Sequence, residues 1–70
     1  MIEVDARGTR CPIPIIELAK AMKPLAIGSE IVLLSDDPAT TPDIHAWARM
    51  TGNEWVQEGI DRFLVRKLSD

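Results

Sequence analysis

The 70-residue sequence has few of the residues that form cross-links or metal sites in small proteins, with one cysteine and one histidine. Aromatic residues are also rare, with one phenylalanine and no tyrosine. A single cysteine excludes an internal disulfide, and one cysteine with one histidine does not form the ligand cluster of a structural zinc site. A run of about 18 apolar residues and a secretory signal pattern are also missing. We therefore expect a soluble, cytoplasmic protein with no metal, no cofactor and no membrane contact, in which the thiol stays reduced.

A surplus of basic charge is absent as well. Eight Lys and Arg residues stand against eleven Asp and Glu residues, which gives a net charge of −3. Domains that bind nucleic acid on their own usually carry a basic surplus, so direct binding of DNA or RNA is not expected. The length and a hydrophobic content of 46% predict one domain over residues 1–70.

Hydrophobic periodicity and the positions of Gly and Pro predict six elements. The segment Ile2–Ala6 alternates apolar and charged residues, as half-buried strands do, while Ile15, Leu18 and Met22 recur at helical spacing. The expected elements are strands at Ile2–Ala6, Glu30–Ser35, Glu54–Glu58 and Arg62–Leu68, a helix that begins at Pro12 and ends before Pro24, and a helix that begins at Pro42 and ends before Gly52.

The element order β-α-β-α-β-β predicts an α/β two-layer sandwich, in which two helices cover one face of a mixed four-stranded sheet. Helical crossovers favour a parallel pairing of the first two strands, and the loops that follow parallel strands lie at the same edge of a sheet. The loop that leads to Cys11 and the loop Asp36–Pro42 are therefore expected to be neighbours. Thr41 is expected to cap the second helix, with Asp43 in its first turn.

Cys11 is the residue around which this scaffold is organised. It lies at a predicted helix N-terminus with Arg7 and Arg10 nearby in sequence, and both features would lower the pKa of a thiol. A lone cysteine is otherwise more often a small buried hydrophobe. Pro12 and Pro14 suit the first helical turn, and they would also hold the sulfur outward. The two arginines are either solvated loop charges or groups that stabilise the thiolate and dock an acidic partner.

Other polar and aromatic residues have simpler interpretations. Asp36 and Asp37 are expected as turn and capping residues rather than as an acid–base pair. His45 is expected on the helix surface and Trp47 in the core, whereas Trp55 suits either the core or an exposed partner anchor. Three basic residues of the last strand are expected on a solvated face or as protection of an edge strand, with a docking patch as the alternative: Arg62, Arg66 and Lys67.

The segment Asp5–Pro14, with Cys11, Pro12 and Pro14 in a Cys-Pro-x-Pro pattern, resembles the N-terminal signature of the TusA (SirA-like) sulfur carriers. The segment Asp36–Ile44 resembles the acidic-proline loop and second helix start of the same proteins. The resemblance covers essentially the whole chain and implies the β-α-β-α-β-β sandwich. It also implies that Cys11 accepts sulfane sulfur as a persulfide from a cysteine desulfurase or a rhodanese. The acceptor would be a DsrE- or TusD-like protein or another one, in tRNA thiolation, cofactor maturation or sulfur oxidation.

Members that serve tRNA thiolation resemble one another in carrying Glu where this chain has Ile13, so the pathway stays open. The absence of a second cysteine suits a carrier, because no thiol of the same chain can discharge the persulfide. We expect a monomeric carrier more than an enzyme. The alternatives are a thiol-based redox sensor and a regulatory interaction module with an idle thiol. We expect Arg7, Gly8, Arg10, Pro12 and Pro14 to support the sulfur, and Asp36, Asp37, Thr40 and Thr41 to dock a partner.

Overall fold

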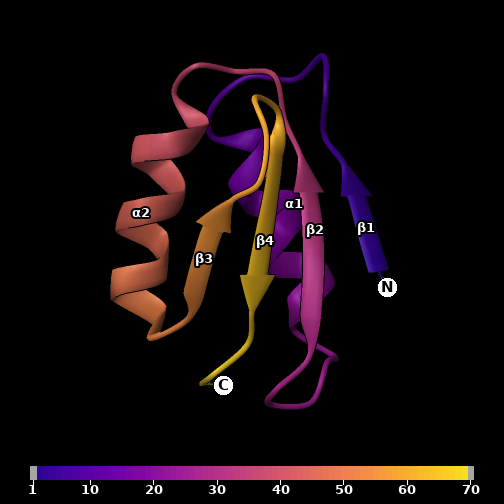
Figure 1. Cartoon of the computed structure of the whole chain (residues 1–70), viewed down its shortest axis with the longest axis vertical. Helices are drawn as coiled ribbons and strands as arrows, with labels where there is room; N and C mark the ends of the chain where they lie inside the picture. Colours follow the sequence, from indigo (N-terminus) through magenta and orange to yellow (C-terminus); the bar gives the residue numbers. More distant parts are fainter. Residues whose placement is uncertain (1, 70) are drawn as a thin grey trace.

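The computed structural model describes residues 2–69, and within this range the six elements follow one another in the predicted order (Figure 1). They are β1 (Ile2–Asp5), α1 (Ile13–Met22), β2 (Glu30–Leu34), α2 (Thr40–Thr51), β3 (Glu54–Gln57) and β4 (Arg62–Arg66). The strands are one or two residues shorter than predicted, and α1 begins one residue later. In the described part of the chain, neither helix has the length and apolar character needed to cross a bilayer.

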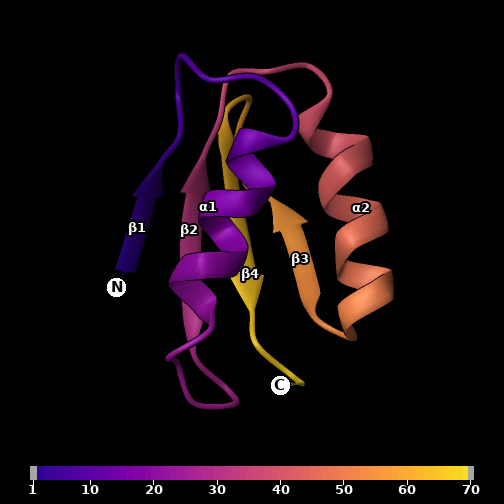
Figure 2. The ribbon, with the colours of Figure 1, turned by 180° about the vertical axis from the view of Figure 1, so that it is seen from behind.

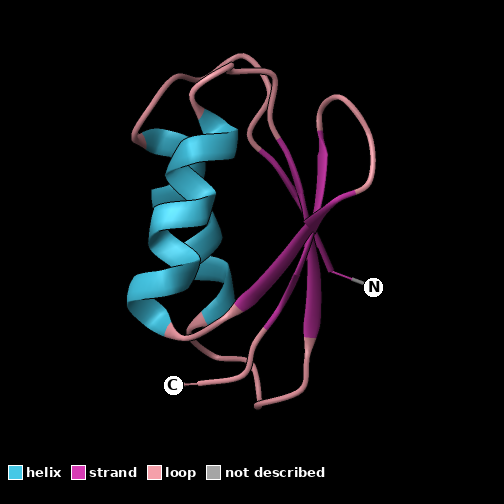
Figure 3. Ribbon diagram, turned by 60° about the vertical axis from the view of Figure 1, so that its left-hand side comes forward, coloured by secondary structure: helices cyan, strands magenta, loops and turns pink. Residues whose placement is uncertain are grey.

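The sheet has the strand order β1-β2-β4-β3. The strands β1 and β2 are parallel, with Val4 opposite Leu33, whereas β4 runs antiparallel to both β2 and β3. Both helices lie against one face of the sheet, so that the molecule has two layers (Figure 3). The predicted α/β two-layer sandwich is confirmed, and the parallel β1–β2 pair is the consequence of the helical crossover between these strands.

The core lies between the helices and the covered face of the sheet. Because successive strand residues point to opposite faces, Ile31 and Leu33 of β2 face the helices together with Phe63 and Val65 of β4. Complete burial of one such side chain contributes about 1.5–3 kcal/mol. The buried cluster consists of Ala6, Leu18, Met22, Ile31, Leu33, Ile44, Phe63 and Val65.

The aromatic residues of α2 and β3 lie at the margin of this core. Trp47, predicted as a core residue, is half-buried and packs against the buried cluster. Trp55 is also half-buried, with its ring 6.3 Å from the ring of Phe63 and 6.2 Å from that of His45. His45 is exposed, as predicted. Trp55 therefore belongs to the packing between β3 and α2 rather than to a free surface.

Lys67 binds the C-terminal end of α1, which lies more than 40 residues before it in the sequence. The prediction of a solvated lysine was wrong, because Lys67 is only 5% exposed. Its Nζ donates hydrogen bonds to the carbonyl oxygens of Met22 at 3.1 Å, Lys23 at 3.3 Å and Leu25 at 2.7 Å. A cation is favoured there because the C-terminus of a helix carries partial negative charge and unpaired carbonyls. Arg66, by contrast, is exposed and paired with Glu30 at 3.0 Å.

The start of α2 differs from the prediction. Thr41 is exposed and does not cap the helix, which begins at Thr40 with Ala39 in the N-cap position. The backbone N–H of Ala39 donates to Oδ1 of Asp37 at 3.1 Å, so Asp37 forms a turn just before the helix, and no side chain caps the helix itself. At the other end, Gly52 has φ 75°, a left-handed conformation that glycine adopts without steric cost.

Candidate functional site

The loop after β1 and the loop after β2 meet at one end of the molecule, where they run side by side (Figures 1 and 2). Three hydrogen bonds join them. Asp36 Oδ1 accepts from the backbone N–H of Gly8 at 3.0 Å and from Nη1 of Arg10 at 3.3 Å. Asp37 Oδ2 accepts from the backbone N–H of Cys11 at 2.6 Å. The predicted contact between the two loops is confirmed, and two adjacent carboxylates make it.

The two aspartates are held ionised by these contacts. The backbone N–H groups of Ala39 and Cys11 lower the pKa of Asp37, and the backbone N–H of Gly8 with the guanidinium of Arg10 lowers that of Asp36. Asp37 forms the local turn that was expected of it, whereas the contacts of Asp36 run across to the other loop and make neither a turn nor a cap. Both carboxylates are therefore negatively charged at neutral pH where the two loops meet.

Cys11 lies in the first of these two loops, directly before Pro12 and α1. Its side chain is exposed, which overturns the alternative of a buried small hydrophobe. The next residue, Pro12, is the N-cap of α1 and is joined to Cys11 by a cis peptide bond, while Pro14 is buried in the first helical turn. Gly8 has φ 86° in the loop that leads to the cysteine, a conformation that favours glycine. The sulfur is thus presented to solvent from a loop that is fixed on both sides.

The thiol of Cys11 does not have the lowered pKa that its position predicted. The carboxylate of Asp43, in the first turn of α2, raises the pKa of the thiol. Desolvation and the negative charges of Asp43 and Asp37 raise the pKa further. Nearby carboxylates therefore favour the neutral thiol over the thiolate in the free protein.

The two arginines that were expected to stabilise a thiolate are bound elsewhere. Arg7 forms a two-pronged ion pair with Asp5, with Nη2–Oδ2 at 2.8 Å and Nε–Oδ1 at 2.9 Å, and this contact lowers the pKa of Asp5 to about 2. Arg10 donates to the carbonyl oxygen of its neighbour Thr9 at 3.0 Å and to Asp36. Since each guanidinium is matched by a nearby carboxylate, neither offsets the negative charge around Cys11.

The surface beside the cysteine is apolar. Ile13 and Ile16, on the first two turns of α1, are 41% and 44% exposed. Thr40, expected among the docking residues, is only 2% exposed, and its hydroxyl shares a 2.6 Å hydrogen bond with that of Ser35. It therefore lies inside the second loop rather than at a docking surface, whereas Thr41 is exposed.

Sequence reasoning missed Asp43 and the two isoleucines as members of this site. The signal for Asp43 was present, because the residue lies in the first turn of a helix that begins at the same sheet edge as Cys11. For Ile13 and Ile16 the signal was ambiguous, because the first turns of α1 are apolar nearly all round.

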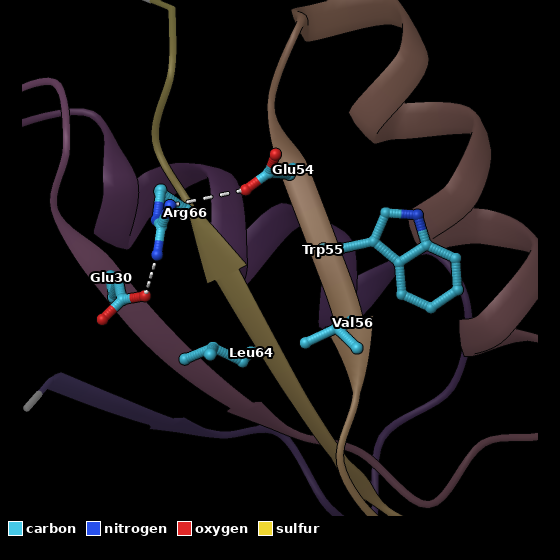
Figure 4. A pocket seen from close by; sticks show the side chains of 6 residues that line it. All are labelled: Glu30, Glu54, Trp55, Val56, Leu64 and Arg66. Carbon is cyan, nitrogen blue, oxygen red and sulfur yellow. Dashed lines mark hydrogen bonds and ion pairs between the residues drawn. The ribbon is translucent and has the colours of Figure 1, made fainter.

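A separate shallow hollow of about 180 Å³ lies on the face of the sheet that the helices leave uncovered (Figure 4). Arg66 lies in it between Glu30 at 3.0 Å and Glu54 at 3.7 Å, with Val56 and Leu64 alongside. Because Glu30 and Glu54 begin β2 and β3, the hollow is at the opposite end of these strands from the loops of the cysteine. Its charges are matched within the sheet, and it is not part of the cysteine site.

Comparison with known proteins matches the model of the family described as "Sulfurtransferase TusA" to residues 2–67. The chain belongs to the TusA family. A protein of Archaeoglobus fulgidus, named provisionally as a sulfur carrier, is 38% identical over 72 residues, which cover 97% of this chain and 99% of the relative. The sulfur carrier protein TusA of Allochromatium vinosum is 33% identical over 69 residues, with 93% and 91% covered.

The fold of this TusA-family chain also agrees with a solved structure. The crystal structure of a SirA-like protein from Desulfitobacterium hafniense superposes with a TM-score of 0.72 at 29% identity, covering 93% of this chain and 92% of the other. The family predicted from the Cys-Pro-x-Pro segment is therefore confirmed. Membership places the chain among the sulfur carriers.

Proposed function

We propose that this chain carries sulfane sulfur as a persulfide on Cys11, between a donor protein and an acceptor protein. The observation that carries the proposal is the exposure of the chain's single thiol at the junction of two hydrogen-bonded loops. A carrier needs one accessible sulfur that enters the active sites of larger partners. The position of Cys11 at one end of the molecule, ahead of α1, suits that requirement.

The transfer is an exchange between a thiol and a persulfide. The thiolate of Cys11 attacks the terminal sulfur of the donor persulfide, a new S–S bond forms, and the donor's S–S bond breaks as the donor leaves as a thiolate. A thiolate of the acceptor then attacks the terminal sulfur bound to Cys11 in the same way. No oxidant or reductant is consumed. The full sequence holds no second cysteine, so no thiol of the same chain competes with the acceptor.

The donor is proposed to be a cysteine desulfurase or a rhodanese, and the acceptor a DsrE- or TusD-like protein or another sulfur acceptor. The exposed isoleucines Ile13 and Ile16, beside Cys11, supply apolar area for docking. Ionised Asp36, in the loop that is hydrogen-bonded to that of the cysteine, and exposed Thr41, at the start of α2, supply polar groups for docking. We propose that the carrier acts as a one-domain monomer in the cytoplasm.

Mass spectrometry of the intact protein tests this function. Incubation with a cysteine desulfurase, cysteine and pyridoxal phosphate, or with a rhodanese and thiosulfate, should add about 32 Da, one sulfur atom. The Cys11→Ser variant should gain no mass under the same conditions. Unchanged mass against several active donors, or sulfur retained by Cys11→Ser, would refute the proposal.

The competing redox-sensor function also starts from the thiolate of Cys11. A peroxide sensor needs a thiolate, because the thiolate is the form that is oxidised to sulfenic acid. Asp43 and Asp37 raise the pKa of Cys11 and so disfavour that form in the free protein. A rapid reaction of Cys11 with peroxide, without sulfur loading, would favour the redox sensor over the carrier.

A further inference from the structure

Both helices end at the opposite end of the molecule from the loop of Cys11 (Figure 2), and a groove lies between these ends. Its volume of about 620 Å³ exceeds the 180 Å³ of the hollow on the sheet and falls within the range of about 300–1,000 Å³ that is usual for small-molecule sites. Ala19 and Lys23 line it from α1, and Trp47 and Met50 line it from α2. The groove therefore has the size of a ligand site and is separate from the cysteine site.

The walls of the groove are apolar and partly open to solvent. Met22, which also lines it, is 3% exposed, and Trp47 is half-buried. Met50, by contrast, is 86% exposed. Methionine is flexible and adapts to ligands of different shape, which is why it is frequent on binding surfaces. The groove therefore offers the apolar part of a ligand one fixed wall and one adjustable wall.

The charged residues that line the groove have one sign. They are Lys23 and Lys67, and no aspartate or glutamate of residues 2–69 is among the lining residues. Lys23 is exposed and forms no ion pair within the same range, whereas Lys20 pairs with Glu17 at 3.7 Å. The ammonium group of Lys23 is therefore available to an anionic group of a ligand.

Helix C-termini usually favour cations, because their last carbonyl oxygens lack partners and carry partial negative charge. Here several of these oxygens are already bound. Lys67 Nζ donates to the carbonyl oxygens of Met22 at 3.1 Å and Leu25 at 2.7 Å at the end of α1. At the end of α2, the carbonyl oxygen of Ala48 accepts the N–H of Gly52 at 2.9 Å. These oxygens therefore need no cationic ligand, and the free charge of Lys23 decides the preference of the groove.

We propose that this groove binds a small amphipathic anion, an aromatic or alkyl group that carries one sulfonate or carboxylate. The apolar part packs against Trp47 and Met50, and the anionic group pairs with Lys23. A cationic ligand would meet lysines and no carboxylate, and a ligand without apolar surface would gain nothing from the walls. The site does not involve Cys11, so the proposal goes beyond the sulfur-carrier function and does not depend on it.

Two fluorescent probes with the same aromatic body test the preference for an anion. 8-Anilinonaphthalene-1-sulfonate is anionic, and N-phenyl-1-naphthylamine is the same molecule without the sulfonate. We expect the wild type to bind the anionic probe with a Kd of about 10–100 µM. The neutral probe should bind about three- to fivefold more weakly, because it lacks one ion pair at an exposed site. Equal affinities for the two probes, or no binding of the anionic probe, would overturn the proposal.

NMR locates the bound probe on the folded protein. Titration of the ¹⁵N-labelled wild type with the anionic probe should shift the indole N–H of Trp47 and the amide of Lys23, and leave the amides of Ile13 and Ile16 in place. Shifts centred on the two isoleucines would put the probe at the apolar surface beside the cysteine, and the groove site would be wrong. If the groove resonances instead move when the free protein is diluted, a second copy of the chain occupies the groove, which would also overturn the proposal.

Removal of one charge tests the role of Lys23. Lys23→Gln should weaken binding of the anionic probe by about three- to fivefold and leave that of the neutral probe unchanged. Lys20→Gln is the control, because it removes a charge three residues away that is paired with Glu17, and it should change neither affinity. An unchanged anion affinity in Lys23→Gln, or an equal loss in both variants, would contradict the ion pair with Lys23.

A second pair of variants tests the apolar wall. Met50→Ala should weaken both probes by about threefold or more, because each buried CH₂ group contributes to binding. Ile60→Ala is the control, at a 90% exposed residue between β3 and β4, and should weaken neither probe. Unchanged affinities in Met50→Ala would show that the probes bind elsewhere. The substituted side chains are exposed, so the variants should keep the fold, and none of the measurements uses a sulfur donor.

Discussion

Asp37 Oδ2 accepts the backbone N–H of Cys11 at 2.6 Å, across 26 residues of sequence. The other oxygen of the same carboxylate accepts the N–H of Ala39, the residue that directly precedes α2. One side chain therefore fixes both the loop that carries the sulfur and the helix that carries Asp43. Substitution of Asp37 should loosen both the loop and the start of the helix. Substitution of Asp36 should loosen only the first loop, through the contacts with Gly8 and Arg10.

Replacement of Asp37 by Asn should loosen the loop of Cys11. Asn offers one acceptor oxygen where the native side chain offers two, so its NH₂ group must face one of the two N–H donors and one hydrogen bond is lost. We expect hydrogen exchange at the Cys11 or Ala39 amide to accelerate by about five- to tenfold, as seen by NMR. Asp36→Asn is the control and should leave both amides protected. Unchanged exchange in Asp37→Asn would show that other contacts hold the loop.

Stability should fall in acid, through the carboxylates of the two loops. The pKa values of Asp36 and Asp37 are lowered in the folded protein, and that of Asp5 is lowered to about 2. Groups with lowered pKa values stabilise the folded state above their unfolded pKa, about 3.9 for aspartate, and lose that contribution as pH falls through the folded value. The urea midpoint should therefore decrease from about pH 4 to about pH 2. In Asp37→Asn the decrease should be smaller, and an identical slope would exclude Asp37 as a source.

Replacement of Lys67 by Met should destabilise the protein as a whole. Met keeps most of the buried stem but leaves the carbonyl oxygens of Met22, Lys23 and Leu25 without the donor that now reaches all three. Loss of partners for buried polar groups costs about 1–3 kcal/mol, which is a large part of the stability of a small domain. Urea unfolding followed by tryptophan fluorescence measures the cost. Lys20→Met, at an exposed lysine of α1, should change the unfolding free energy by less than about 0.5 kcal/mol.

Periodicity was enough to predict the fold and the meeting of the two loops, because strand and helix periods are local properties and parallel strands end at the same edge. The behaviour of charged residues was not predictable in the same way. The arginine and the lysine find partners at very different separations: Arg7 binds Asp5, two residues away, whereas Lys67 binds the end of α1, 45 residues from Met22. The carboxylate that pairs with an arginine, and the burial of a lysine, depend on the packed structure. The separation of two residues along the chain does not determine either. For the same reason the pKa of Cys11 is raised, whereas its position in the sequence predicted that it would be lowered.

The apolar surface beside Cys11 yields the last prediction, which concerns docking. Ile13 is 41% exposed on the first turn of α1, so a glutamate there remains solvated and should leave the unfolding free energy within about 0.5 kcal/mol of the wild type. A donor that covers this residue, however, would have to bury an unpaired charge. We therefore expect Ile13→Glu to slow sulfur loading by about tenfold or more, at limiting donor concentration.

The control for that prediction is Ile27→Glu, because Ile27 is 59% exposed in the connection between α1 and β2, at the end of the molecule away from the cysteine. Loading is measured by intact mass over time with one donor. Ile13→Glu should slow alkylation by iodoacetamide, measured without donor, much less than it slows sulfur loading. Iodoacetamide is small and needs no docking surface on the protein. If Ile13→Glu and Ile27→Glu load at the wild-type rate, the donor approaches Cys11 from the side of Asp36 and Thr41, where the chain offers charge and hydroxyl groups instead of apolar area.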